Sequence, residues 1–108
     1  MAARSQPGRR AVYAISVAAE LTGAAVQNLR VYERRGLVEP ARTEGGTRRY
    51  SEDDLDRVRR VLTLLEEGLN LAGIALVLRL EDDNARLRRQ VSKTHDDVRD
   101  PGHGIMEA

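Results

Sequence analysis

Apolar residues recur at helical spacing in two short stretches within the first third of the chain. The first stretch predicts a helix that is capped by Ser16 and ended by Gly23. The second predicts a helix from about Val26 to Arg35, with Gly36 as its C-terminal stop. Because only two or three residues separate these helices, the pattern is typical of a helix-turn-helix.

A β-hairpin is predicted directly after the second helix. Two strand-like runs, residues 37–40 and 47–50, flank a polar stretch with Gly45 and Gly46 at its middle. A hairpin in this place is a wing. The expected fold class is therefore mainly α: a winged helix-turn-helix with a short β-hairpin wing and a C-terminal coiled-coil helix for dimerisation.

Two longer helices follow the predicted wing. Ser51 and Asp54 form a capping-box pattern at the start of the first helix, which Gly68 ends. Asn70 is placed to cap the second helix. The residues expected on the inward face of the first helix are Leu55, Val58, Leu62 and Leu65.

An apolar seam along the last helix predicts a homodimer. Its positions follow one another at intervals of three and four residues, a heptad stripe of about two repeats. They are Val77, Leu80, Asn84, Leu87 and Val91. Helices shorter than about 12–15 residues are marginal alone, so this one needs a partner, and a second copy of the chain is the expected one. We interpret Asn84 as a residue that sets register and partner choice.

These patterns divide the chain into four parts. Residues 1–11 are expected to form a disordered basic arm, and residues 12–75 a winged helix-turn-helix domain that binds DNA. Residues 76–92 form the expected dimerisation helix, and residues 93–108 a flexible tail.

Composition removes several classes of function. The 108 residues include no Cys, which excludes disulfides, thiolate metal sites and Cys nucleophiles. Phe and Trp are absent and there are only three Tyr, too few for a platform that stacks on bases. Neighbouring carboxylates on predicted helix surfaces do not make an acid–base pair in a closed pocket. We expect no enzymatic activity, no cofactor and no metal site.

Positive charge is concentrated in one third of the chain. The formal net charge is only +1, but six Arg stand against three Glu between Ala24 and Tyr50. No apolar run approaches the roughly 20 residues of a bilayer span, so no membrane association is expected. Double-stranded DNA is the expected partner of the basic segment.

The second helix of a helix-turn-helix enters the major groove, where its outer face meets base edges. The residues expected to do so are Gln27, Asn28, Arg30 and Val31. Residues expected to meet phosphates are Tyr32, Arg34 and Arg35. The wing adds Arg42, Arg48, Arg49 and Tyr50. Two alternatives stay open: Tyr32 and Tyr50 as packing residues in a core with few aromatics, and Arg34 and Arg35 as a solvated helix end.

The helix-turn-helix over residues 12–36, the wing end 47–51 and the helix opening 70–74 together resemble the MerR family of bacterial transcription regulators. Residues 13–23 and the run Asn-Leu-Ala-Gly-Ile at 70–74 resemble its heat-shock repressor (HspR-like) branch in particular. The resemblance implies a homodimeric winged-helix protein whose C-terminal helix forms an antiparallel coiled coil with its mate and which binds inverted-repeat operators. The absence of Cys suits a reducing cytoplasm and residues 1–10 lack the apolar stretch of a signal peptide, so we expect a cytoplasmic, nucleoid-associated protein.

The resemblance carries further expectations. Arg30, Tyr32, Arg49 and Tyr50 match the family positions that contact DNA. Heat-shock repressors act on chaperone genes with the DnaK chaperone as co-repressor. The second helix begins at Ala25 without the polar cap that relatives often have, so we expect its first turn to fray or to start late. No effector-binding region follows the seam, so small-molecule sensing is not expected.

Two other classes of function remain open from the sequence. One is an excisionase-like architectural protein, which uses a similar winged helix but binds DNA beside a recombinase. The heptad seam favours a self-contained dimer instead. The other is a protein-interaction module whose seam pairs with a different regulator and whose basic face meets an acidic protein.

Overall fold

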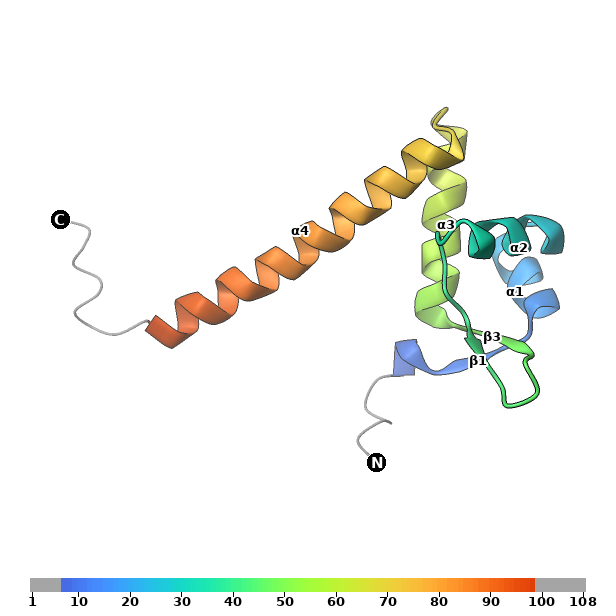
Figure 1. The fold of residues 1–108 in the computed structure, drawn as a ribbon, viewed down its shortest axis with the longest axis horizontal. Coiled ribbons are helices and arrows are strands. Elements are labelled where there is room, and N and C mark those ends of the chain that lie inside the picture. The colour runs from blue at the N-terminus through green and yellow to red at the C-terminus, as the bar shows by residue number, and fades with distance from the viewer. Residues whose placement is uncertain (1–6, 99–108) are drawn as a thin grey trace. The chain divides into compact units, whose positions relative to one another are not determined.

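The computed structural model describes residues 7–98, and it confirms the predicted mainly helical architecture with a small sheet and a long C-terminal helix (Figure 1). The elements are, in chain order, η2 (Pro7–Arg9), β1 (Ala11–Tyr13), α1 (Ile15–Thr22), α2 (Val26–Arg34), β2 (Ala41–Arg42), β3 (Arg48–Ser51), α3 (Glu52–Glu66) and α4 (Leu71–Val98). The chain divides into two compact units, and the boundary between Ala75 and Leu76 falls inside α4.

Helices α1 and α2 are joined by a short turn that is locked by local hydrogen bonds. Gly23 has φ 87°, a conformation that residues with a Cβ rarely adopt, and its N–H donates to Ala19 O. The Thr22 hydroxyl donates to Ala18 O at 2.8 Å and accepts from the Ala24 N–H at 3.2 Å. The predicted two-helix unit is therefore present with its predicted stop at Gly23.

Two expectations for the helix starts are wrong. Ser16 does not cap α1, because the helix begins at Ile15 with Ala14 at the N-cap, two residues before the predicted cap. The chain leaves strand β1 at Tyr13, and the Ala14 carbonyl already accepts from the Ala18 N–H at 2.9 Å. Helix α2 starts at Val26 and not late, because the Ala25 carbonyl accepts from the Leu29 N–H at 3.0 Å without a side-chain cap.

A three-stranded antiparallel sheet in the order β1-β3-β2 holds the wing. Strands β2 and β3 form the hairpin, with Ala41 opposite Arg49 and Arg42 opposite Arg48. Its turn is closed by the Thr43 N–H donating to Thr47 O at 2.8 Å. The first strand is Ala41–Arg42 and not residues 37–40, because Leu37 and Val38 are buried in the core instead.

Strand β1 pairs with the other edge of β3, with Tyr13 opposite Tyr50. The expectation of a disordered arm through Ala11 is therefore wrong for residues 7–11, because residues 7–9 form η2 and Ala11 begins β1. The short turn η2 approaches α3 closely, since a Cβ on Gly8 would lie 2.7 Å from Asp53 Oδ1. The remaining residues of the predicted arm, 1–6, lie outside the described part of the chain.

Helix α3 begins with the predicted capping box. The Asp54 N–H donates to Ser51 Oγ at 3.0 Å, and the Ser51 N–H donates to Asp54 Oδ2 at 2.9 Å. The helix ends at Glu66, just before Gly68. Its buried residues are Leu55, Val58, Val61 and Leu64, which confirms Leu55 and Val58, whereas Leu62 and Leu65 are only half-buried.

Helix α4 starts at the predicted cap and runs further than predicted. Asn70 Oδ1 accepts from the Gly73 N–H at 2.8 Å, and Ile74 in the first turns is fully buried. The helix continues to Val98, so residues 93–98 of the predicted flexible tail are helical. Residues 99–108 of that tail lie outside the described part of the chain. Among the described residues, no helix is long and apolar enough to cross a membrane.

Candidate DNA interface

Helix α2 presents one buried and one exposed face. Leu29 and Tyr32 are buried and hold the helix against the core. The exposed residues are Gln27, Asn28, Arg30, Arg34 and Arg35, while Val31 is half-buried. The helix therefore displays amides and guanidiniums, the groups that pair with base edges and phosphates in the major groove.

Both tyrosines of the candidate site are buried. Tyr32 is 4% exposed and Tyr50 is 0% exposed, so the Tyr50 ring has no atom at the surface. Burial raises the pKa of both hydroxyls, and the Tyr50 hydroxyl has no hydrogen-bond partner. These two rings thus fit the packing alternative, and the expected DNA contact of Tyr50 does not fit this conformation.

A carboxylate that the sequence analysis did not single out joins α2 to the wing. Arg42 Nη2 of β2 donates to Glu33 Oε2 at 2.7 Å, and Arg48 Nε of β3 donates to Glu33 Oε1. Glu33 is the one acidic residue within α2, and its position among six arginines was the only sequence signal for this role. We call Glu33, Arg42 and Arg48 the wing clamp.

The wing clamp keeps Glu33 ionised. Burial alone would raise the pKa of this carboxyl, but the hydrogen bonds and charges of Arg48 and Arg42 outweigh burial and lower it below its ordinary value of 4.5. Arg42 also donates through Nη1 to Gly46 O at 3.0 Å, which ties it to the hairpin turn. Two of the wing arginines expected at the DNA interface, Arg42 and Arg48, are therefore engaged within the protein.

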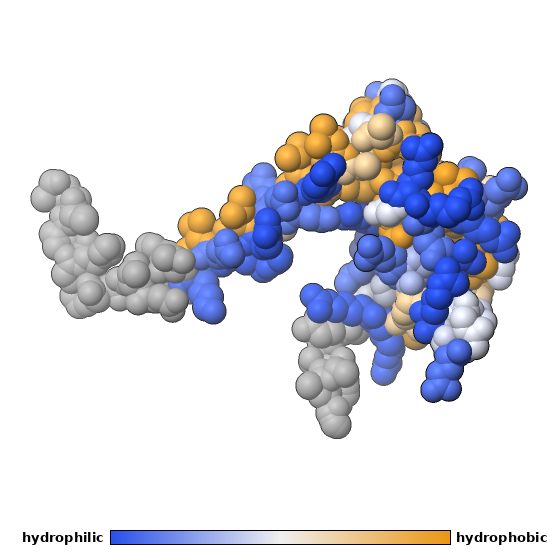
Figure 2. All heavy atoms as spheres, in the orientation of Figure 1, coloured by the Kyte–Doolittle hydropathy of each residue, from blue (hydrophilic) through white to orange (hydrophobic). Residues whose placement is uncertain are grey.

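The other arginines of the candidate site are differently placed. Arg30, Arg34 and Arg35 are exposed, and Arg49 is half-buried with one donor at 3.3 Å from Arg48 O. Arg30 and Arg48 both act to lower the pKa of the buried Tyr50 hydroxyl, so both charges lie near the same ring. On the face shown in Figure 2, hydrophilic residues cover much of the helix-turn-helix and wing.

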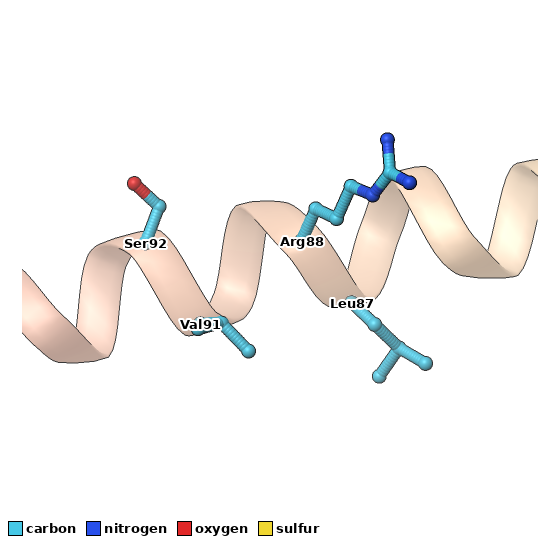
Figure 3. Close-up of a pocket in the computed structure, with 4 residues that line it drawn as sticks. All are labelled: Leu87, Arg88, Val91 and Ser92. Atoms are coloured by element: carbon cyan, nitrogen blue, oxygen red, sulfur yellow. The ribbon is translucent and has the colours of Figure 1, made fainter.

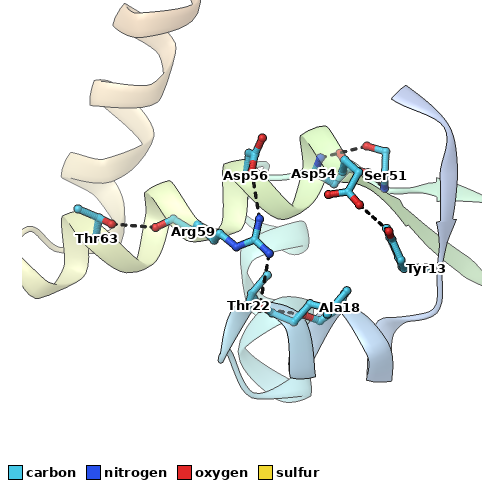
Figure 4. Close-up of polar contacts among 10 residues, drawn as sticks. Tyr13, Ala18, Thr22, Ser51, Asp54, Asp56, Arg59 and Thr63 are labelled. Atoms are coloured by element: carbon cyan, nitrogen blue, oxygen red, sulfur yellow. Dashed lines mark hydrogen bonds and ion pairs between the residues drawn. The ribbon is translucent and has the colours of Figure 1, made fainter. Parts of the chain in front are cut away.

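Polar contacts from α3 hold the helix-turn-helix in place (Figure 4). Arg59 donates to Leu21 O at the end of α1 at 3.3 Å and pairs with Asp56 at 3.1 Å. Arg57 Nε donates to Leu37 O at 2.9 Å and so fixes the segment after α2. These bonds satisfy the Leu21 carbonyl in the last turn of α1 and the Leu37 carbonyl in the segment after α2, and they tie both to α3.

Helix α4 carries an exposed apolar stripe. Leu76, Leu80, Leu87 and Val91 are all more than half exposed, between 51% and 67%. Of the other seam positions, Asn84 is exposed and Val77 is half-buried, so Leu76 joins the stripe where the sequence pattern placed Val77. Figure 3 shows Leu87 and Val91 pointing to one side of the helix, with Arg88 and Ser92 on the other.

Comparisons with known proteins agree in one family. The model of the MerR helix-turn-helix family of regulatory proteins matches residues 13–81. The chain is 48% identical over 83 residues to a protein named putative heat shock protein HspR from Streptomyces coelicolor, covering 76% of this chain and 55% of that one. It is 35% identical to the HTH-type transcriptional regulator TnrA from Bacillus subtilis, covering 76% of this chain and 74% of that one.

A solved structure shares the fold. The N-terminal part of MtaN, the multidrug transporter activator of Bacillus subtilis, superposes with a TM-score of 0.58 at 26% identity. The match covers 80% of this chain and 91% of that one. The chain spans only about half of the HspR relative, 55% of its length.

Proposed function

Since this chain belongs to the MerR family of DNA-binding transcriptional regulators and is not an enzyme, we propose that it is a dimeric repressor of heat-shock and chaperone genes that binds inverted-repeat operators. The observation that carries the DNA-binding part is the exposed face of α2 beside the wing. It gathers amide and guanidinium side chains on a helix whose other face is anchored by Leu29 and Tyr32.

The heat-shock assignment is supported by the relative named HspR. An identity of 48% over 83 residues is higher than the 35% to the TnrA regulator. We therefore place the target genes in the stress response, and we place the protein in the cytoplasm with the nucleoid DNA. The DnaK chaperone as co-repressor belongs to this same proposal and depends on it.

The dimer is supported by the apolar stripe on α4. Four large aliphatic side chains along one side of the helix are each more than half exposed, and exposed apolar stripes of this kind mark interaction surfaces. Burying one Leu or Val fully gains about 1.5–3 kcal/mol. A second α4 offers a matching stripe. Two joined copies present two α2 helices, and this symmetry corresponds to the two halves of an inverted repeat.

DNA binding is tested by selecting preferred sequences from a pool of duplexes with a randomised centre and measuring affinity at several salt concentrations. We expect an inverted repeat to be enriched, and log K to fall by about 0.9 per neutralised phosphate for each unit of log salt. Arg30→Ala is expected to lower affinity for the selected duplex by about 1–3 kcal/mol, while Arg79→Ala on α4 is the control. Flat salt dependence contradicts the proposal.

The biological role is tested in cells. DNA fragments bound to the native protein are recovered before and after heat shock, and we expect chaperone promoters that are lost on heating. Purified DnaK is expected to raise the affinity for those fragments. Enrichment of unrelated promoters would remove the heat-shock assignment and leave the family assignment intact.

A further inference from the structure

The wing places two guanidiniums directly opposite each other. Arg42 on β2 and Arg48 on β3 are cross-strand partners in the hairpin register. Like charges in facing positions destabilise a strand pair unless an anion lies between them. Glu33 supplies that anion from α2, with one carboxylate oxygen for each arginine.

We propose that Glu33 sets how many positive charges the DNA-facing surface offers to a duplex. It does so by binding Arg42 and Arg48 in ion pairs between α2 and the wing, which keeps both guanidiniums away from phosphates. This inference rests on the proposed DNA-binding function. It makes Glu33 a positioning residue, and it leaves Arg34, Arg35 and Arg49 as the arginines that neutralise phosphate.

The burial of the wing clamp supports this division of roles. The side chains of Glu33 and Arg48 are only 18% and 24% exposed, whereas Arg42 is 46% exposed. A phosphate that takes either arginine must displace an ionised carboxylate from charge-assisted hydrogen bonds, and its own charge is repelled by that carboxylate. Arg34 and Arg35 have no ion pair within the described residues, so a phosphate meets no such competitor there.

The arrangement also bears on sequence discrimination. Contacts to phosphate strengthen binding to every duplex alike, whereas base contacts distinguish one duplex from another. A surface that withholds two of its arginines from phosphates binds arbitrary DNA less tightly. Glu33 thereby increases the share of binding that comes from base contacts by the exposed side chains of α2, and it keeps the wing in a fixed place beside them.

The test measures binding to a duplex of arbitrary sequence, about three helical turns long, as a function of NaCl concentration. Glu33→Gln keeps the shape of the side chain and removes its charge. We expect log K to fall more steeply with log salt than in the unaltered protein, by about 0.9 for one released arginine and about 1.8 for two. Glu44→Gln in the wing turn changes the net charge equally without touching the wing clamp and is expected to leave the slope unchanged.

Arg42→Gln provides the second arm. In the otherwise unaltered protein it is expected to leave the slope as it was, because Arg42 is held by Glu33. In the Glu33→Gln background it is expected to make the fall of log K with log salt shallower by about 0.9, because Arg42 then contacts phosphate and its loss removes that contact. Arg42 is the most exposed member of the wing clamp, so the single variant Arg42→Gln can still be measured, and can still overturn the inference, if Glu33→Gln does not fold.

Either of two results overturns the inference. One is a salt dependence of log K for Glu33→Gln that is no steeper than for Glu44→Gln. The other is a salt dependence that becomes shallower by about 0.9 in Arg42→Gln alone. If the unaltered protein shows no salt-dependent binding, the proposed function itself fails, and the two failures are thus distinguishable.

Discussion

Ser51 and Asp54 cap the first turn of α3 for each other: each side chain accepts a hydrogen bond from the other residue's backbone N–H, at 3.0 and 2.9 Å. Ser51 is also the last residue of β3 and is buried. The pair therefore joins the wing strand to the helix that carries the core. A capping box that is readable from the sequence thus helps to place the wing of the candidate interface.

Replacing Ser51 tests this junction. We expect Ser51→Ala to lower the free energy of unfolding by about 1 kcal/mol, because the Asp54 N–H loses its acceptor. The matched control is Ser16→Ala, which is exposed in the first turn of α1 and caps nothing, and it is expected to change stability by less than about 0.5 kcal/mol. Urea denaturation followed by circular dichroism measures both, and equal effects would contradict the assignment of the cap.

The Tyr50 hydroxyl offers a second test. It is buried without a hydrogen-bond partner, a situation that costs about 1–3 kcal/mol. Tyr50→Phe removes the hydroxyl and keeps the ring, so the free energy of unfolding is expected to stay the same or rise. Affinity for DNA is expected to be unchanged. A tenfold loss of affinity in a binding titration would show that the Tyr50 hydroxyl contacts DNA.

The pKa of Glu33 predicts how stability depends on pH. Its folded-state pKa lies below the ordinary value of 4.5, so the ionised carboxylate stabilises the folded protein above that pH. The contribution is lost as the pH falls through the folded pKa, because both states are then protonated. Comparing urea denaturation of the unaltered protein with Glu33→Gln from neutral pH down to pH of about 3, we expect the difference to shrink below 4.5. A difference that does not change over this range would show that the charge of Glu33 is not stabilising.

The stripe on α4 predicts which substitutions break the dimer. Leu87→Asp puts a charge where a partner helix is expected to bury an aliphatic side chain worth about 1.5–3 kcal/mol, and should raise the dissociation constant at least about tenfold. Ser92→Asp adds the same charge on the other side of the helix (Figure 3) and is the control. Light scattering over a range of concentrations measures both. Equal masses for the two variants would mean that the stripe is not the dimer interface.

Local signals in the sequence were sufficient for most element ends. Gly23, Gly68 and the capping residues Ser51 and Asn70 act on backbone groups within a few positions of themselves, so their effect is readable from neighbouring residues. The same holds for the hairpin turn at Gly46, whose φ of 87° suits glycine. Helical spacing of apolar residues likewise predicted α1, α2, α3 and α4.

What the local signals missed depends on partners far along the chain. Strand β1 exists because β3 offers it an edge across about 40 positions, since Tyr13 pairs with Tyr50. Ser16 is of a residue type that often caps helices, but the end of that strand at Tyr13 sets where α1 begins.

By itself the sequence determined the helix periods, their stops, the wing turn and the concentration of arginine, because these depend on neighbours and composition alone. Tertiary structure decided that Tyr32 and Tyr50 pack inside, and that Glu33 pairs with Arg42 and Arg48. Burial and ion pairing depend on which surfaces meet in space, and residues 9 and 15 positions apart come together only when the wing folds back on α2.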